Sequence, residues 1–466
     1  MKGFNNLSQR TGKHEIVPIS RFLRVCSRLS LLAATVALLS ATLQAAPPFV
    51  YSNLNLTSPN AVGGFELGPP NTLTPIFGTP WSTSPTSSSA VYFDALKDQA
   101  LYANTDAPHL PPCLYVGELS SGSYPNGDIA AFTINTGTGA LTYVASYPTP
   151  AGITPPFNGI ALSPGHKLPA LFAGYSAPFP GTNYVTVWRI NQNTCALTFQ
   201  QQAVASPLNG GAIDGMAESQ DDTTLVAAYA DGSIESFPTV PGFTISPGCP
   251  VNSTGFVSQG SWPSGVDVTA DSKYAIFGDQ PAGGSGPNIT EVEMVKLPIA
   301  CSSTTTDWGG PLHSNVGPFY LGTAINSTNV WLGPEEHNLF VSNNGSEQVT
   351  TIKFNESLYP AAATMTLAGA PPNPPCLSVF TNPTTLRPPV PGIPFYPNGM
   401  QTSITLAPNP LRVYVGEFDV IPASDAVGLL RVQLGTGCTN EPTGSPYFDF
   451  GNVLGSQLSA WPPRPF

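Results

Sequence analysis

The sequence predicts an all-β protein built from repeated antiparallel sheets, and three observations lead to that class. A unit made of a turn, a short apolar run and an alternating run recurs roughly every 50 to 74 residues along the chain. Turn-forming residues are abundant, with 52 Pro and 45 Gly. Hydrophobic residues still make up 41% and aromatic residues 10% of the chain, which is enough to build a core and argues against disorder.

The repeat is clearest in five apolar runs that each end on a polar residue, and weaker copies end at Gly174 and Tyr229. A fixed unit repeated in this way predicts sheets that are stacked or arranged radially. The five clear copies are Phe49-Val50-Tyr51-Ser52-Asn53, Leu114-Tyr115-Val116-Gly117-Glu118, Ala275-Ile276-Phe277-Gly278-Asp279, Leu339-Phe340-Val341-Ser342-Asn343 and Val413-Tyr414-Val415-Gly416-Glu417.

One complete copy, between residues 159 and 199, shows what a unit contains. Short apolar runs at 159–162 and 170–173 flank a turn, and residues 184–190 alternate between apolar and polar side chains. After a second turn at 191–194, a fourth run begins at Cys195. Four consecutive antiparallel strands of about five residues are the content of one propeller blade.

The third strand of the unit can be counted along the whole chain, and seven copies predict a seven-bladed β-propeller with four-stranded antiparallel blades. The first copy begins at its second strand, so we expect residues 453–459 to supply its inner strand and to close the ring with both termini. An open solenoid is the alternative, but it would need distinct capping repeats. The seven third strands are expected at 61–67, 128–134, 184–190, 232–237, 289–295, 349–354 and 427–434.

Residues 1–46 have the pattern of a signal peptide. Six Lys and Arg residues precede an uncharged apolar stretch at 29–41, and Ala45 and Ala46 offer a cleavage point. The stretch is short for a membrane span, so an uncleaved anchor is the less favoured alternative, and no second candidate span follows. We therefore expect an exported protein, periplasmic or extracellular, with one propeller domain at 47–466.

The charge balance narrows the class of partner. The chain has 16 basic and 28 acidic residues, and residues 1–45 contain six of the basic residues and one of the acidic residues. The rest of the chain therefore has 10 basic and 27 acidic residues, a net charge of −17. This balance argues against nucleic acid and against an anionic membrane surface. The partner is expected to be a small molecule, a glycan or a protein, and no cofactor or metal is indicated.

The cysteines are compatible with disulfides in an exported protein. Cys26 leaves with the signal peptide, and an even number remains, for which fifteen pairings are possible. No CxxC pair occurs, so a zinc site is not indicated. The six remaining cysteines are Cys113, Cys195, Cys249, Cys301, Cys376 and Cys438.

Strand order assigns the histidines to the two faces of a propeller. The turns between first and second strands share one face, and the ends of the second strands share the other face, the top, with the blade-to-blade connections. His109, His166 and His337 fall in first turns, where a structural role is expected. His14 lies in the signal region. His313 falls in a blade-to-blade connection and is the candidate catalytic residue.

Polar residues at the ends of the second strands form the candidate ligand site. Glu118, Asp279, Asn343 and Glu417, with Asn53 in the first copy, would surround the top face and could bind a sugar-like ligand. The alternative is that these side chains satisfy backbone groups at hairpin tips and stay solvated.

Four more acids, Asp214, Glu218, Asp221 and Asp222, lie in or beside the fourth inner strand. They lack the spacing of a calcium loop.

The motif Ser163-Pro164-Gly165-His166-Lys167, followed by Leu171-Phe172-Ala173-Gly174 and the strand at 184–190, resembles the lactonase-type seven-bladed propellers and the YVTN-repeat propellers. The resemblance covers nearly all of residues 47–466 and implies that fold. In catalytic members it implies a histidine at the start of an inner strand, with Arg and Glu lining the channel. The matching starts at 157–159, 214–215, 263–265 and 398–399 contain no histidine.

Two functional hypotheses follow. The first is an exported binding or scaffold module without catalysis of its own, because the expected catalytic position is empty. The second is a lactonase-like hydrolase or isomerase that acts on a lactone or small sugar acid at the top face, with His313 and neighbouring acids. Fold resemblance alone supports the second hypothesis, because propellers host many functions.

Overall fold

The computed structural model describes residues within the compact unit Pro47–Phe466. Residues 1–47, which include the whole of the expected signal peptide at 1–46, lie outside the described residues, and so does His313. The described ranges are 48–54, 60–68, 72–83, 99–104, 107, 109–119, 126–153, 159–178, 180–208, 210–231, 233–240, 242–252, 262–280, 291–299, 327–332, 338–343, 348–353, 366–367, 400–408, 411–420, 423–432, 439–440, 447–448 and 458–461.

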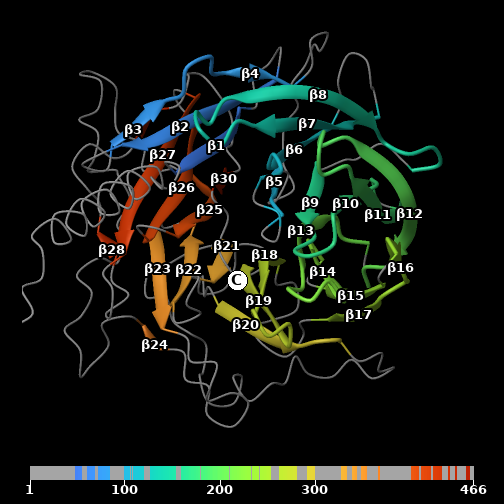
Figure 1. Ribbon diagram of the computed structural model, residues 1–466. Coiled ribbons are helices and arrows are strands. Elements are labelled where there is room, and N and C mark those ends of the chain that lie inside the picture. Colours follow the sequence, from blue (N-terminus) through green and yellow to red (C-terminus); the bar gives the residue numbers. More distant parts are fainter. Residues whose placement is uncertain are drawn as a thin grey trace, which may run out of the picture. The chain divides into compact units, whose positions relative to one another are not determined.

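Strands and turns make up the described residues, and every pair of neighbouring strands among them is antiparallel, as the alternating sequence pattern predicts. The strands form seven sheets, and we number these sheets by the chain order of their second strands. Figure 1 shows the strands of each sheet side by side, and neighbouring strands mostly follow one another in the chain, with β30 beside β1 as the main exception. No helix among the described residues is long and apolar enough to cross a membrane.

The first three sheets are the most completely described. The first contains β30 (Leu458–Trp461), β1 (Phe49–Leu54), β2 (Ala61–Gly68), β3 (Thr72–Pro75) and β4 (Trp81–Ser82). The second contains β5 (Gln99–Tyr102), β6 (Cys113–Glu118), β7 (Asp128–Ile134) and β8 (Leu141–Pro148). The third contains β9 (Ile160–Pro164), β10 (Ala170–Tyr175), β11 (Asn183–Ile190) and β12 (Leu197–Ala205).

The remaining four sheets keep the same order of strands. The fourth contains β13 (Ile213–Glu218), β14 (Thr224–Tyr229), β15 (Ser233–Val240), β16 (Thr244–Ile245) and β17 (Cys249–Asn252). The fifth contains β18 (Trp262–Val268), β19 (Tyr274–Gln280) and β20 (Glu291–Lys296). The sixth contains β21 (Ser327–Leu332), β22 (Asn338–Asn343), β23 (Gln348–Lys353) and β24 (Thr366–Leu367). The seventh contains β25 (Met400–Pro408), β26 (Leu411–Val420), β27 (Ala423–Val432), β28 (Thr439–Asn440) and β29 (Tyr447–Phe448).

The third strands expected from the sequence are all present, as β2, β7, β11, β15, β20, β23 and β27. The prediction for β7 has the observed bounds, Asp128–Ile134, and the other bounds differ by a few residues. The strands are placed well because apolar and polar residues alternate along them with a period of two.

The first sheet contains strands from both ends of the described chain. β30 pairs with β1, so that Phe49 lies opposite Trp461 and Ser52 lies opposite Leu458. Residues 453–459 were expected here, but only 458 and 459 are described, and the strand continues to Trp461. Leu458 and Ala460 pack with Val50 in the core of this sheet, because alternate residues share one face.

The first strand of four sheets contains a one-residue β-bulge near its start. These bulges follow Ile213 in β13, Ser264 in β18, Ser327 in β21 and Gln401 in β25. A bulge removes one residue from the ladder and redirects its side chain. In β18 the extra residue is Gly265, whose φ of +59° suits glycine. In β13 the extra residue is Asp214.

The core lies between the facing surfaces of neighbouring sheets. Phe49 and Tyr51 of the first sheet pack with Leu114, Val116 and Phe132 of the second. Burying each large apolar side chain contributes about 1.5 to 3 kcal/mol, so these junctions carry most of the stability. Similar clusters join the second sheet to the third, the third to the fourth, and the fourth to the fifth.

Candidate functional site

The four predicted ligand residues occupy matching places near the ends of second strands. Glu118 ends β6 and Asn343 ends β22, whereas Asp279 lies next to the last residue of β19 and Glu417 lies within β26. They belong to four different sheets. Glu118 is the one whose side-chain surroundings the structure describes, so a shared role in binding stays a prediction.

Glu118 is buried, with 4% of its surface exposed, and its carboxylate contacts the first sheet. Asn60 Nδ2 donates a hydrogen bond of 2.9 Å to Glu118 Oε1, and the Thr83 hydroxyl donates a short one to the same oxygen. Asn60 is itself oriented by the backbone N–H of Ala61, which donates to its Oδ1 at 3.0 Å. The expectation that a polar residue at this hairpin tip stays solvated is therefore wrong for Glu118.

A second carboxyl lies beside Glu118. Asp128, the first residue of β7, is directly opposite Glu118 in the strand pair and is fully buried. Gln99 of β5 lies opposite Val116, two residues before Glu118, and is 95% buried. Cross-strand neighbours share a face of the sheet, so Gln99, Glu118 and Asp128 all belong to the face that meets the first sheet.

Sequence reasoning missed Asp128 because it treated each second-strand end by itself. A signal was available: a hairpin that pairs β6 with β7 places the last residue of one strand opposite the first residue of the next.

Burial raises the pKa of Glu118 to about 7, and the charge of Asp128 adds to this effect.

Asp214 forms a separate acidic position at the bulge of β13. The residue is partly buried, and burial of its carboxyl, ahead of the charge of Asp231, raises its pKa to about 7. The sequence identified Asp214 only as one of several acids near this strand. The bulge, which sequence periodicity does not show, is what separates it from the ladder.

Asp231 and Glu235 are held by the connections around Asp214. Asp231 Oδ1 accepts hydrogen bonds from the backbone N–H of Ser233 at 2.9 Å and from its hydroxyl at 2.5 Å. Glu235 Oε2 accepts from the Tyr229 hydroxyl at 2.5 Å and from the N–H of Ser206 at 2.9 Å. These contacts fix Asp231 and Glu235, whereas the Asp214 side chain forms no hydrogen bond with another described residue.

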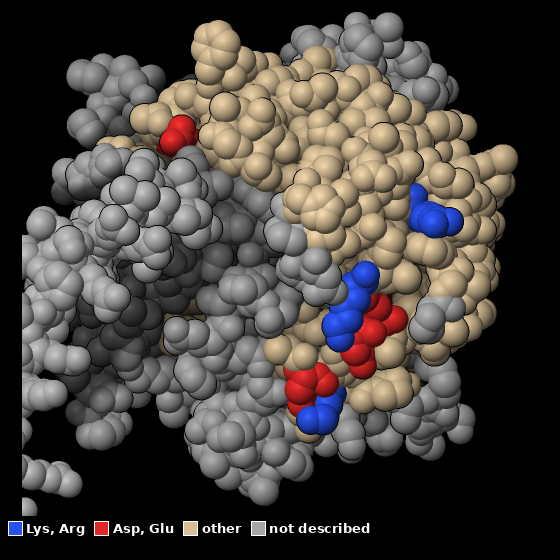
Figure 2. All heavy atoms as spheres, viewed as in Figure 1, with Lys and Arg blue, Asp and Glu red and all other residues tan. Residues whose placement is uncertain are grey.

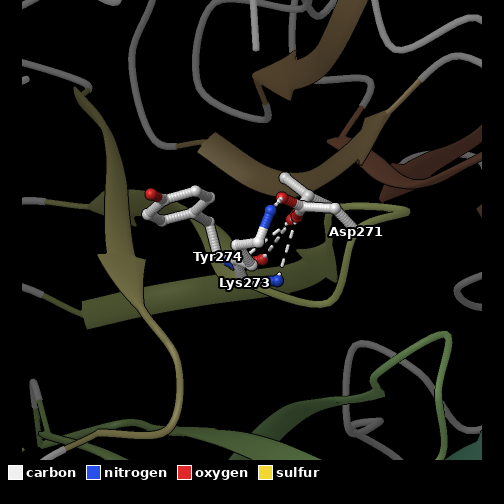
Figure 3. Close-up of polar contacts among 4 residues, drawn as sticks. Asp271, Lys273 and Tyr274 are labelled. Atoms are coloured by element: carbon white, nitrogen blue, oxygen red, sulfur yellow. Dashed lines mark hydrogen bonds and ion pairs between the residues drawn. The ribbon is translucent and has the colours of Figure 1, made fainter. Parts of the chain in front are cut away.

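The other acids near β13 hold turns in place. Asp221 Oδ1 accepts hydrogen bonds from Ser219 and Thr223 within its own turn. Asp271 has the same role in the fifth sheet: it accepts from the backbone N–H of Lys273 at 3.0 Å and pairs with its Nζ at 2.6 Å (Figure 3). Groups of three or more metal-ligating side chains do not occur among the described residues.

The described histidines lie where the sequence placed them. His109 is in the connection between β5 and β6, and His166 is in the turn between β9 and β10. Nε2 of His166 lies 3.1 Å from the carbonyl oxygen of Glu218. The backbone N–H of His166 donates a hydrogen bond of 2.7 Å to the Asp222 carboxylate. These contacts support a structural role for His166. His337 lies outside the described residues.

Cys113 and Cys195 form a disulfide, one of the pairings left open by the sequence. It joins β6 to the turn before β12, and both residues are fully buried. Cys249 begins β17, and Cys301, Cys376 and Cys438 lie outside the described residues. Figure 2 shows few charged side chains on the described part of this face, with both signs close together where they gather.

The comparisons with known proteins show the fold. No protein-family model and no curated protein sequence matches this chain. A candidate 6-phosphogluconolactonase of Bacteroides uniformis has a TM-score of 0.55 at 14% identity, over 89% of this chain and 99% of that protein. A candidate 6-phosphogluconolactonase of Bacteroides fragilis has a TM-score of 0.52 at 13% identity, over 90% and 99%. The periplasmic gluconolactonase of Pseudomonas aeruginosa has a TM-score of 0.53 at 12% identity, over 89% and 99%.

These similarities support the β-propeller fold that the repeat predicts, of the lactonase type that the resemblance implies. At such low identity they give the fold alone, so the activity has to be argued from the residues of this chain.

Proposed function

We propose that the chain is an exported, seven-bladed β-propeller whose ring is closed by β30 and β1. The seven sheets, the pairing of Phe49 with Trp461 and the packing of each first strand against its neighbours support this arrangement. The disulfide between Cys113 and Cys195 and the pattern of residues 1–46 support export, because disulfides persist in oxidising compartments.

We propose further that the protein is a lactonase-like hydrolase and that Asp214 is its general base. The observation that carries this proposal is the position of Asp214: it is the bulged residue at the start of the fourth first strand. This is one of the positions where the family resemblance implies a catalytic histidine. A carboxyl with a pKa of about 7 supplies the same chemistry, since a general base works best when its pKa is near the working pH.

In this mechanism the Asp214 carboxylate takes a proton from water while the water oxygen attacks the lactone carbonyl carbon. The ring C–O bond then breaks, and the protonated Asp214 returns its proton to the leaving alkoxide. The product is the open hydroxy acid, and Asp214 ends as a carboxylate.

The substrate that suits this site is an uncharged lactone. Asp231 contributes negative charge next to Asp214, and the chain after residue 45 holds 10 basic against 27 acidic residues. Both features disfavour a phosphorylated lactone, which carries about two negative charges near neutral pH. The activity named for the Pseudomonas aeruginosa protein, gluconolactonase, is of this uncharged class.

The test is hydrolysis of a lactone panel by the purified protein without residues 1–46. The panel contains glucono-δ-lactone, neutral γ-lactones of sugar acids and 6-phosphogluconolactone. Wild type is compared with Asp214→Asn, His313→Ala and Glu66→Gln, the last being a partly buried carboxyl on β2 that serves as the control. We expect a neutral lactone to be hydrolysed, and Asp214→Asn to reduce kcat by about 10² to 10⁴-fold while the control retains activity.

Two results would contradict this assignment. Absence of turnover across the panel removes the hydrolase. Turnover that depends on His313 but not on Asp214 gives the role of base to the histidine.

A second candidate function, a binding module without catalysis, is favoured by the absence of histidine from the four matching strand starts. In that case Asp279, Asn343 and Glu417 are the proposed ligand residues, and Glu118 contributes by holding the junction of the first two sheets. A glycan and sugar-acid array then gives a ligand that wild type binds without turning over. Glu417→Gln should weaken its binding, and unchanged affinity would remove Glu417 from the site.

A further inference from the structure

The junction of the first two sheets contains two buried carboxyls that face each other. Glu118 and Asp128 are direct cross-strand partners, exposed by 4% and 0%, and the side chains of directly opposite residues lie next to each other on one face of the sheet. Glu118 Oε1 receives the hydrogen bonds from Asn60 and Thr83, whereas Oε2 has no hydrogen-bond donor among the described residues.

Two carboxylates cannot both stay ionised at such a site. Like charges that lie close together repel strongly where water is excluded, and a single proton shared between the two carboxyls removes one charge and supplies a donor for a hydrogen bond between them. Burial is the largest cause of the raised pKa of Glu118 and the charge of Asp128 is the next, which agrees with this geometry.

We propose that Glu118 and Asp128 share one proton in the folded protein and form a pH-sensitive lock between the first and second sheets. While the proton is present, Glu118 holds Asn60 and Thr83 of the first sheet. When it is lost, two adjacent buried negative charges push the carboxyls apart, and this repulsion outweighs the stronger hydrogen bonds that an ionised Glu118 accepts, so those contacts loosen.

The other groups that face the pair are neutral among the residues the structure describes. From the first sheet, Asn60 and Thr83 face Glu118. Gln99 lies on the same face in β5, and from the third sheet Tyr175 of β10 senses the charge of Asp128. Burial raises the pKa of the Tyr175 phenol, so this group is also uncharged near neutral pH. Lys97 and Asp98, just before β5, lie outside the described residues.

Hydrogen exchange at two amides measures the lock directly. The N–H of Ala61 donates to Asn60 Oδ1 and the N–H of Thr83 donates to Asn60 O, both at 3.0 Å, so both amides report opening of the Asn60 contact. After correction for intrinsic exchange, we expect their opening equilibrium in wild type to rise at least tenfold between pH 5.5 and 8.5, since a pKa shift of one unit corresponds to a factor of about ten. The N–H of Thr269, which bonds to Tyr274 O in the fifth sheet, is the reference.

Three variants separate the lock from general pH effects. Glu118→Gln and Asp128→Asn each remove one titrating carboxyl and should abolish the pH dependence at Ala61 and Thr83. Glu66→Gln, on β2 of the first sheet, should leave it unchanged. Infrared spectroscopy provides a second readout, because both variants should lose one component of the protonated-carboxyl C=O absorption that wild type shows at pH 6, while the component from Asp214 remains.

The proposal is wrong if exchange at Ala61 and Thr83 does not depend on pH, or if no protonated-carboxyl band is lost in either variant. It is also wrong if Ca²⁺ at pH 6 protects these amides in wild type but not in Glu118→Gln. That result would assign the neutralising role to a cation in place of a proton.

Discussion

The carboxylate of Asp222 accepts a hydrogen bond from the backbone N–H of Leu168, at 2.7 Å, and so joins the first turns of two neighbouring sheets. The same carboxylate accepts from the N–H groups of His166 at 2.7 Å and Lys167 at 2.6 Å. Asp222 is 7% exposed and has a φ of +55°, a left-handed conformation that Asp adopts more readily than most residues. This contact fixes the third sheet against the fourth.

We expect Asp222→Gly to lower the free energy of unfolding by about 2 to 4 kcal/mol, because three backbone donors lose a charged acceptor while the left-handed backbone is kept. Asp222→Ala should cost roughly 1 kcal/mol more, since alanine is strained at that φ. Urea unfolding measures both values. Lys167→Ala is the matched control, because the backbone and not the exposed side chain of Lys167 makes the contact. Equal stability of the Gly and control variants would show that the contact contributes nothing.

The turn between β7 and β8 provides a prediction about packing between the second and first sheets. Gly139 has a φ of +69°, and a Cβ on it would lie 2.6 Å from Phe49 Cδ1 and 2.7 Å from Ile76 Cδ1. Its carbonyl also accepts a 2.8 Å hydrogen bond from the Tyr51 hydroxyl. We expect Gly139→Ala to destabilise the protein by about 2 to 4 kcal/mol through backbone strain and overpacking together.

Two other glycines separate these causes. Gly152 has a φ of +90° with nothing within 4 Å of its added Cβ, so Gly152→Ala should show the backbone strain alone, about 1 kcal/mol. Gly137, in the same turn as Gly139, meets only Asn135 at 3.4 Å, and Gly137→Ala should be nearly neutral. Thermal unfolding should rank the losses Gly139, Gly152 and then Gly137, and a different ranking contradicts the packing argument.

The disulfide predicts a dependence on redox conditions. Cys113 and Cys195 are separated by 82 residues, and closing a loop of that size removes about 4 kcal/mol of conformational freedom from the unfolded chain. A double variant that carries Cys113→Ser and Cys195→Ser should have an unfolding free energy lower by an amount of that order. Dithiothreitol should lower the Tm of wild type and leave the Tm of the double variant unchanged. An effect on both proteins would indicate another disulfide.

The sequence was most informative about strands, because side-chain alternation is a local property. The bounds of β7 match the prediction, and the ends of β6 and β22 fall on Glu118 and Asn343 as expected. Contacts between sheets are harder to predict from the sequence. Burial of Glu118 depends on Asn60 and Thr83, which are 58 and 35 residues away in the chain. Nothing in the local pattern around Glu118 indicates either partner.

The candidate base shows the same limit. Asp214 stands out only because a bulge places it outside the ladder, and a single-residue bulge leaves the hydrophobic pattern of β13 nearly unchanged. Its neighbour Asp231 is 17 residues further along the chain and approaches through the turn after β14. The sequence favoured His313 because histidine titrates near neutral pH without help, whereas an aspartate acquires this property only from its surroundings.

The raised pKa of Asp214 makes a prediction about activity as a function of pH. As a general base, Asp214 is active when ionised, so kcat/KM for a neutral lactone should rise with pH through about 7 and then level off. Asp231→Asn removes the nearby charge that contributes to the raised pKa, and it should move the rising limb to lower pH while keeping the plateau.

The effect of Asp214 on stability has the opposite dependence on pH. A folded-state pKa above the unfolded value contributes stability below the unfolded pKa, and this contribution is lost as the pH rises through 7. Asp214→Asn should therefore raise the Tm more at pH 8 than at pH 5, whether or not the protein is an enzyme. An unshifted limb in Asp231→Asn would remove Asp214 as the titrating base, and a Tm difference independent of pH would show that its carboxyl is not held at a raised pKa.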